Sequence, residues 1–340
     1  MNTPASTLEL ASLRRRGIAA TFAEDRLLGE LYKLLWGLDL LTRTSRQLVI
    51  EAVGTGNPHA ACRIMSRRNA FIDKGAWSLF WSVTHASIEI SSRGFGSTHE
   101  PELNGAYMGQ LRTSLAQFAD PTGAANCACI IGDHATLGNE ARSGADFGLI
   151  LEVGSGPAAR YVVCLLQAKR ATSRVVDVRR GAGDSTQLDR LVESGIGSYL
   201  FYHHHDDPRG LGPTVRSADS IPAADASRVN AVLGTDDLAA RLAAAVHQVR
   251  RSRPEMPGMG FADDRADAAR LLFNPDVPDI VVNDVLVARV GDASREPASV
   301  VGFEDEWAAV IDEHRASLDR VRGTERHGRS DEFEPPIRGG

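Results

Sequence analysis

The chain has 340 residues, of which 43% are hydrophobic and 24% charged, and its formal net charge is −6. This composition excludes wholesale disorder, and the length suffices for one large domain or two ordinary ones with a buried core. No apolar run approaches the roughly 20 residues of a membrane-spanning helix, so we expect no membrane partner. The net charge gives no sign of a polyanionic ligand, but a local basic groove on an acidic protein is compatible with DNA binding.

The N-terminus and the cysteines indicate the compartment. The opening residues, MNTPASTLELASLRRR, lack the apolar region of a secretory signal. Cys164 lies in an apolar run, which favours a reduced, buried thiol over a disulfide. No CxxC pair occurs among the cysteines, which are Cys62, Cys127, Cys129 and Cys164. We therefore expect a cytoplasmic protein.

Periodicity in the first two thirds of the chain predicts an α/β arrangement. Apolar residues recur at helical spacing in three segments, which are residues 7–36, 58–74 and 100–118. Three β-rich segments follow, at residues 126–134, 145–153 and 161–169, and a short turn joins the last two as a hairpin. A helix ended by Gly195 and a strand over 198–202 come next. The predicted order from residue 100 is helix, three strands, helix, strand.

The remaining third is predicted to elaborate this core. A polar connection over 206–226 precedes a helix over 235–249, a strand over 280–290 and a helix over 304–321. The resulting division has four parts: a helical N-terminal region at 1–99, a core at 100–205, an α/β C-terminal elaboration at 206–322 and a polar, disordered tail at 323–340.

Three polar residues flank the predicted hairpin. Asp146 opens its first strand, and Gln167 and Lys169 close its second. Side chains alternate along a strand, so Gln167 and Lys169 point to the same face, and the hairpin brings Asp146 near them. Carboxylate and amide oxygens are the ligands that Mg²⁺ prefers, and a lysine beside such a site can act on an attacking water and on developing charge.

The pattern Asp146…Gln167-Ala-Lys169, in this order of helices and strands, resembles the PD-(D/E)xK restriction-endonuclease-like superfamily, and most closely its QxK branch with the Mrr-type nucleases. The resemblance implies a restriction-endonuclease-like core over about residues 100–204. It also implies that Asp146 and Gln167 bind Mg²⁺, for which Mn²⁺ can substitute, and that Lys169 assists the attacking water.

The same resemblance points to further residues. In that family an acid on the helix before the sheet often joins the site, and Glu102 is the best-placed match, with Glu140 as the reserve. Gln187 occupies the place of a polar residue that contacts the lysine or the DNA. Exonuclease-like members carry a tyrosine where this chain has Leu191, which favours an endonuclease. The alternative for Glu102 is that it only complements the N-terminus of its helix.

A basic cluster follows the second strand of the hairpin. It could track DNA phosphates or be an ordinary solvated loop, and its members are Arg170, Arg174, Arg179 and Arg180. These features together predict a Mg²⁺-dependent DNA endonuclease, which the resemblance places in restriction or anti-phage defence. The chain has no ATPase motif, so translocation would need a separate ATPase or helicase partner, and a homo-oligomer stays open. The alternatives are a catalytically silent nucleic-acid-binding module and a ribonuclease of the same fold.

Overall fold

A mixed β-sheet is the centre of the computed structural model. The residues that the structure describes are 37–93, 99–118, 126–132, 145–154, 156–178, 186–203, 212–232, 235–250, 255–274, 282, 284–291 and 302–330. Eight of the described strands form the sheet, in the order β1-β10-β2-β3-β5-β6-β8, with β9 paired to β3. Their bounds are Cys127–Gly132 for β1, Asp284–Val290 for β10, Phe147–Val153 for β2, Arg160–Ala171 for β3, Gly197–His203 for β5, Thr214–Ser217 for β6, Asp236–Asp237 for β8 and Gly260–Ala262 for β9.

Strands β2 and β3 form the predicted antiparallel hairpin. Phe147 pairs with Leu166 and Val153 with Arg160, so the two strands are in register along all of β2. Gly154 has a φ of +90°, a conformation that favours glycine, in the turn between them. Because β3 has 12 residues and β2 only 7, the C-terminal part of β3 extends beyond the first residue of β2. The candidate site lies at this overhang.

The predicted order of helix, three strands, helix and strand is confirmed for the elements of the main sheet and their helices. It corresponds to α6 (Glu100–Gln117), β1, β2, β3, α7 (Gln187–Glu193) and β5, with β5 parallel to β3. One unpredicted strand, β4 (Val175–Val176), lies between β3 and α7 and pairs outside this sheet with β7 (Val229–Asn230). The sequence did not predict that β10 lies between β1 and β2, antiparallel to the first and parallel to the second. The expected C-terminal elaboration therefore supplies a central strand of the sheet.

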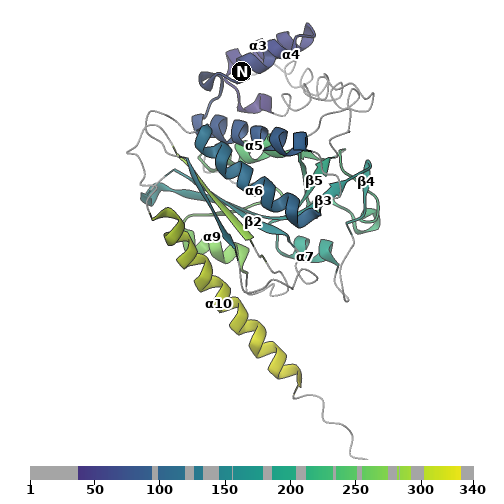
Figure 1. The fold of residues 1–340 in the computed structure, drawn as a ribbon, viewed down its shortest axis with the longest axis vertical. Helices are drawn as coiled ribbons and strands as arrows, with labels where there is room; N and C mark the ends of the chain where they lie inside the picture. The colour runs from purple at the N-terminus through teal and green to yellow at the C-terminus, as the bar shows by residue number, and fades with distance from the viewer. Residues whose placement is uncertain are drawn as a thin grey trace, which may run out of the picture.

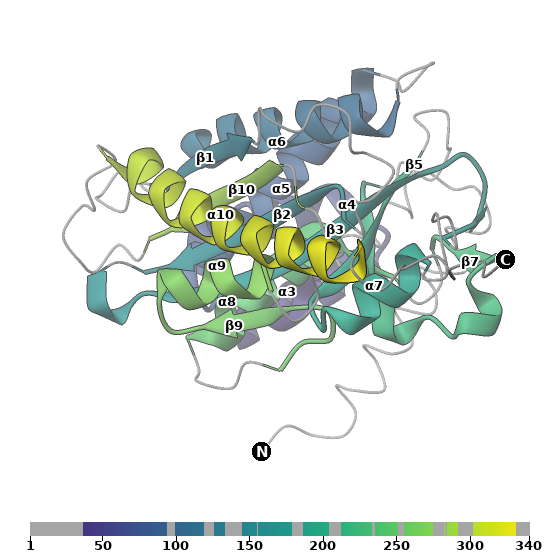
Figure 2. The same ribbon diagram turned by 90° about the horizontal axis from the view of Figure 1, so that it is seen from below.

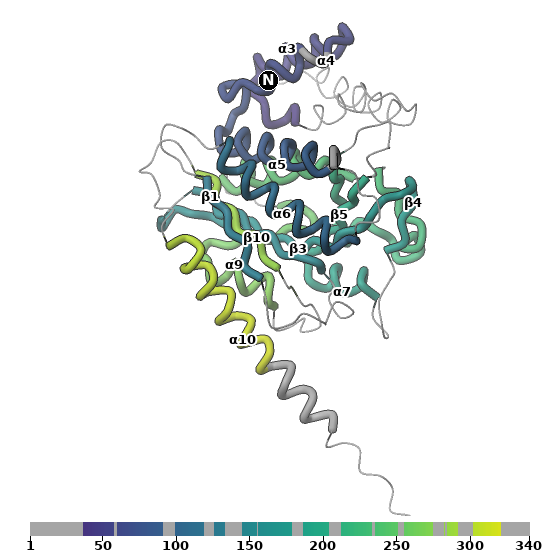
Figure 3. The backbone as a smooth tube through the Cα atoms, in the orientation of Figure 1, coloured from purple at the N-terminus to yellow at the C-terminus, as the bar shows by residue number. Residues whose placement is uncertain are grey.

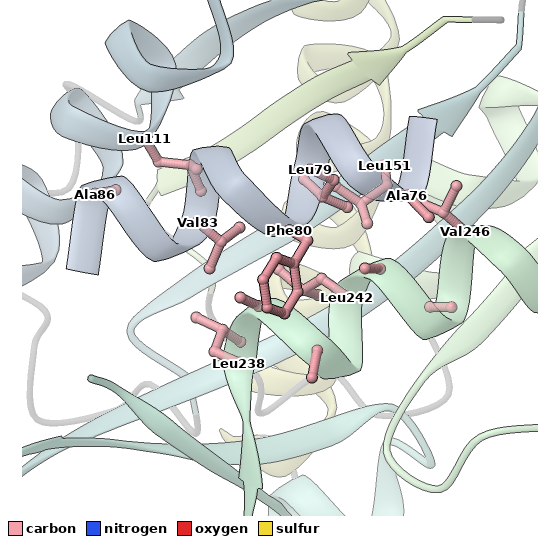
Figure 4. Close-up of a cluster of buried hydrophobic side chains, with 14 of the residues drawn as sticks. Ala76, Leu79, Phe80, Val83, Ala86, Leu111, Leu151, Leu238, Leu242 and Val246 are labelled. Carbon is pink, nitrogen blue, oxygen red and sulfur yellow. The ribbon is translucent and has the colours of Figure 1, made fainter. Parts of the chain in front are cut away.

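Helices cover both faces of the sheet (Figure 1). One face packs against α5 (Lys74–Arg93), α6 and α8 (Leu238–Val249), and Figure 4 shows Leu79, Phe80 and Val83 of α5 against Leu242 and Val246 of α8. The other face packs against α7, α9 (Arg265–Leu272) and α10 (Phe303–Ser330). Alternating side chains of each central strand thus enter two separate cores, which explains why β2 and β3 are apolar on both faces.

The N-terminal part differs from the predicted helices. The helix expected over 58–74 is three pieces: α4 (Pro58–Met65), a 3₁₀ turn at Arg68–Ala70 and the start of α5. The break before α5 arises because the buried Asp73 accepts a hydrogen bond from the Ala76 amide, 3.0 Å away, and begins a new helix. Before α4, the described elements are α3 (Arg43–Gly54) and a 3₁₀ turn at Gly37–Leu40. The helix predicted at 7–36 lies outside the described residues.

Helix α10 is longer than predicted. It crosses the sheet face that also carries α9 and then runs away from the sheet (Figures 2 and 3). It continues to Ser330, whereas the sequence predicted disorder from residue 323. A single glycine inside a helix costs only about 1 kcal/mol, so Gly323 does not end it. No helix in the described part of the chain is long and apolar enough to cross a membrane.

Candidate active site

Asp146 lies beside the β3 overhang, directly before the first residue of β2. Its amide donates to the Leu166 carbonyl over 2.9 Å, which continues the ladder one residue before β2. Its side-chain Oδ2 accepts two hydrogen bonds of 2.8 Å, from the Gln167 Nε2 and from the Ala168 amide. The hairpin therefore joins Asp146 and Gln167 as the sequence predicted, and neither of these two bonds uses the second carboxylate oxygen.

Lys169 lies on the same face of β3 as Gln167, as strand alternation predicted. Its side chain is only 7% exposed, although lysine is among the residues least often buried. The charge of its ammonium acts on Asp146 and lowers the pKa of that carboxyl group. An acid, an amide and an ammonium therefore lie together in a buried part of the sheet, where charges interact more strongly than in water.

Burial is the largest influence on the protonation of Asp146. Removal from water raises the pKa of its carboxyl group above the ordinary value, and the nearby charge of Glu100 raises it further. The ammonium of Lys169 and the hydrogen bonds from Ala168 and Gln167 act in the opposite direction without cancelling the effect of burial. The site therefore holds a carboxylate whose negative charge is incompletely compensated by the surrounding protein.

The side-chain amide of Gln167 uses its nitrogen but not its oxygen in hydrogen bonds with the described residues. Its Nε2 donates to Asp146 and, over 3.3 Å, to the Ala168 carbonyl. Its Oε1 is buried without a hydrogen-bond partner among the described residues, and the residue as a whole is 2% exposed. Leaving a buried acceptor unsatisfied costs about 1–3 kcal/mol. An acceptor held at that cost beside a carboxylate is suited to receive a cation or a donor from a ligand.

The acid that reaches this edge from α6 is Glu100. Its Oε1 accepts a 3.0 Å hydrogen bond from the Arg170 amide, so Asp146 and Glu100 bind alternate amides of the β3 overhang. Glu102, the acid chosen from the sequence, instead accepts from the His99 amide over 3.3 Å and is part of a capping box. Because Glu102 is the third residue of α6, its carboxylate folds back on the helix end. The geometry thus favours Glu100, which is two residues earlier.

The remaining predicted residues have varied positions. Glu140, Arg179 and Arg180 lie outside the described residues. Arg170 is half-buried at the end of β3, and Arg174 is exposed in the turn that follows. Gln187 is the first residue of α7, on the Lys169 face of the sheet, and its Oε1 is buried with no hydrogen-bond partner among the described residues.

Tyr199 is a neighbour that the sequence analysis missed. It pairs with Gln167 across β3 and β5 and is fully buried, and its hydroxyl donates to the Val178 carbonyl over 3.0 Å. Burial raises the pKa of its phenol, and the charges of Asp189, Asp146 and Asp177 raise it further. Tyr199 therefore stays a neutral donor that fixes the chain leaving β3. The alternation of the 198–202 strand could have identified it, because it shares a face with Gln167.

Comparisons with known proteins add no assignment. No family model matches the chain, and neither a curated protein nor a solved structure is significantly similar to it. Within the described ranges, no three His, Cys, Asp or Glu side chains form a group that could hold a metal ion. The cluster at β3 has two such acids, Asp146 and Glu100, beside the Gln167 amide.

Proposed function

We propose that the chain hydrolyses phosphodiester bonds of DNA as a Mg²⁺-dependent endonuclease, with its active site at the β3 overhang. The observation that carries the proposal is the Gln167 amide, whose buried oxygen has no partner among the described residues while its nitrogen contacts the Asp146 carboxylate. A role in restriction or defence against phage belongs to the same proposal and rests on the resemblance to QxK nucleases alone.

The residues of the site fit a hard divalent cation. Asp146 supplies a buried carboxylate, Gln167 an amide oxygen and Glu100 a second acid, and all three are of the ligand type that Mg²⁺ prefers. Such an ion would lower the pKa of a water and offset negative charge on a phosphate group. Where no cation is bound, the Gln167 nitrogen neutralises part of the Asp146 charge by donating to it.

Lys169 would stabilise the charge that develops on the reacting phosphate. Its ammonium is held on the Gln167 side of β3 with little access to water, so its charge is weakly screened. Only 3 residues of the chain are lysines (Lys33, Lys74 and Lys169), whereas Lys and Arg together number 38. A chain that almost always uses arginine for positive charge has a lysine here, where a compact ammonium differs from a planar guanidinium.

The flanking basic residues support a polyanionic substrate. Arg170 follows Lys169 directly near the end of β3, and Arg174 lies in the turn after this strand. Side chains in this place would bind the phosphates on either side of the scissile bond and hold it against the site. Gln187, whose Oε1 has no partner within the described part of the chain, would contribute a polar contact from α7.

The test is cleavage of supercoiled plasmid with Mg²⁺ or Mn²⁺, with EDTA as the control. Nicked or linear product that needs the metal is expected from the wild-type chain. Lys169→Ala should lower the cleavage rate by about 10²–10³-fold, as loss of a group that stabilises transition-state charge does. Lys74→Ala, which removes an exposed lysine at the start of α5, is the matched control and should cleave normally.

If the wild type shows no metal-dependent cleavage, the nuclease proposal is wrong and the alternative of a catalytically silent nucleic-acid-binding module is favoured. Preference for RNA in a parallel reaction would indicate a ribonuclease. Full activity in folded Lys169→Ala protein would show that the active site is not at the β3 overhang.

A further inference from the structure

The N-terminal helical unit carries an excess of positive charge that the candidate active site does not use. Residues 41–72 contain five basic residues and one acid, Glu51, in a chain whose net charge is −6. The basic residues are Arg43, Arg46, Arg63, Arg67 and Arg68. Arg46 pairs with Asp39, so the net charge left on this segment is +3. A positive patch on an acidic protein is a local electrostatic feature, because it opposes the field of the whole molecule.

The backbone of this unit is a helix–turn–helix. Helices α3 and α4 are joined by the three residues Thr55, Gly56 and Asn57. Gly56 has a φ of +71°, and the Asn57 side chain accepts from the Ala60 amide over 3.0 Å to begin α4. Two helices joined by such a short, glycine-containing turn can present one helix to the major groove of B-form DNA.

Helix α4 is held in a fixed position on α5. The indoles of Trp81 and Trp77 donate to the carbonyls of Met65 and Ser66 at its C-terminal end, over 2.9 and 3.2 Å. On the same side, Ala61 and Met65 are fully buried. The outward side of this segment is therefore presented by a helix anchored on α5, and such preorganisation lowers the entropic cost of binding a ligand.

Exposed arginines occupy that outward side. Arg63 in the last turn of α4, Arg67 just beyond it and Arg43 at the start of α3 are all exposed. A cation in the first turn of a helix opposes the helix dipole, and α3 has no acid there to offset Arg43. Arg46, by contrast, is occupied by the Leu38 carbonyl and Asp39. Helix stability does not account for Arg43, whereas binding of an anion would.

We propose that α3, its turn and α4 form a docking surface for duplex DNA, in which Arg43, Arg63 and Arg67 bind the phosphate backbone. The choice of DNA as the polyanion rests on the proposed function. A B-form major groove admits an α-helix, whereas the major groove of duplex RNA is too deep and narrow, so the helix pair favours DNA. The surface lies beyond α5, on the opposite side of the sheet from α7 and α10 (Figure 1), so it would bind DNA away from the reacting bond.

The test is binding of a fluorescent 30-base-pair duplex to the full chain in EDTA, followed by anisotropy from about 50 to 200 mM salt. The double substitution Arg63→Gln/Arg67→Gln should weaken binding at least tenfold at the higher salt. It should also reduce the slope of log K against log salt by about 2, because each lost phosphate contact removes about 0.9. Arg112→Gln/Arg270→Gln removes the same charge from exposed sites on α6 and α9 and should leave the slope unchanged.

Several results would overturn the docking surface. They are no duplex binding by the wild type, an unchanged slope in the Arg63/Arg67 variant, an equal loss in the control, or displacement of the duplex by duplex RNA or polyglutamate at lower concentration than by unlabelled DNA. If Arg63→Gln/Arg67→Gln has a lower slope than the wild type but the wild type never cleaves DNA, the nuclease proposal is refuted and the docking surface stands. If the wild type cleaves DNA but the two slopes are equal, the docking surface is refuted and the nuclease proposal stands.

Discussion

The two ends of strand β2 bury charged residues in different ways. At its C-terminal end, Glu152 is 1% exposed and its two oxygens are fully engaged. Oε1 binds Arg289 of β10 over 2.6 Å, and Oε2 accepts from the Trp307 indole over 3.1 Å and lies 3.4 Å from Arg265. These partners come from β10, α10 and α9, so the cluster fastens the C-terminal elements to the sheet.

At the N-terminal end, the corresponding cluster is incomplete. Asp146 and Lys169 are opposite charges, but the Gln167 oxygen beside them has no partner among the described residues. Buried polar networks stabilise a fold when every member is satisfied and destabilise it when one is not. The difference teaches that the Glu152 end serves the fold, whereas the Asp146 end keeps an acceptor that no described residue satisfies.

The largest expected effect is the loss of stability when the Glu152 cluster is disrupted. Glu152→Ala leaves Arg289 buried without its carboxylate, and loss of one partner of a buried pair costs about 3–5 kcal/mol of unfolding free energy. Urea denaturation measures the loss. Glu306→Ala removes the exposed partner of Arg265 and should cost less than about 1 kcal/mol. Equal losses in the two variants would show that the Glu152 cluster does not hold the sheet.

Asp146→Asn should weaken Mn²⁺ binding by about 10- to 100-fold, or about 1.4–2.7 kcal/mol, because a neutral amide replaces an anionic ligand. Calorimetric titration of both proteins measures the change. Glu102→Gln removes an acid from the α6 end and should bind Mn²⁺ like the wild type. Unchanged affinity in Asp146→Asn would make Asp146 a structural residue of the hairpin.

Substitutions of the two α6 acids, Glu100 and Glu102, should have different effects on the cleavage rate in a Mg²⁺ titration. Glu100→Gln should cleave about tenfold more slowly at limiting Mg²⁺, because the site has lost an anion, and a further Gln167→Glu change should restore part of the rate. Glu102→Gln should cleave normally and lose only about 0.5–1 kcal/mol of stability, as expected of a helix-end acid. Normal cleavage by Glu100→Gln throughout the titration would remove Glu100 from the site.

The smallest effect is on the pH dependence of stability. Burial raises the pKa of Asp146, so between the ordinary and the raised value the folded protein keeps a proton that the unfolded chain releases. Its contribution to stability is present at low pH and is lost as the pH rises through the raised pKa. The unfolding free energy of the wild type, relative to Asp146→Asn, should therefore fall with rising pH in EDTA. A rise would mean that Lys169 outweighs burial.

Local pattern predicted the hairpin and the meeting of Asp146 with Gln167, because strand alternation and a short turn fix both. It could not distinguish Glu100 from Glu102, since the choice depends on how the end of α6 approaches the Arg170 amide, which donates to Glu100. The position of β10 within the sheet could not be predicted from the sequence either. Its apolar residues predict a strand, but any open edge of the sheet could have paired with them.

The position of β10 also has a consequence for how the chain is made. β1 and β2 are successive in the sequence, yet each has β10 as a hydrogen-bonding neighbour, and β10 begins only at Asp284. A ribosome therefore releases the β2–β3 hairpin with one edge of β2 still unpaired, a state that invites aggregation until the late strand arrives. Closing the sheet is a long-range step and hence a slow one. Asp146 directly precedes that edge, so the strand next to the candidate site stays exposed until Asp284–Val290 has been made.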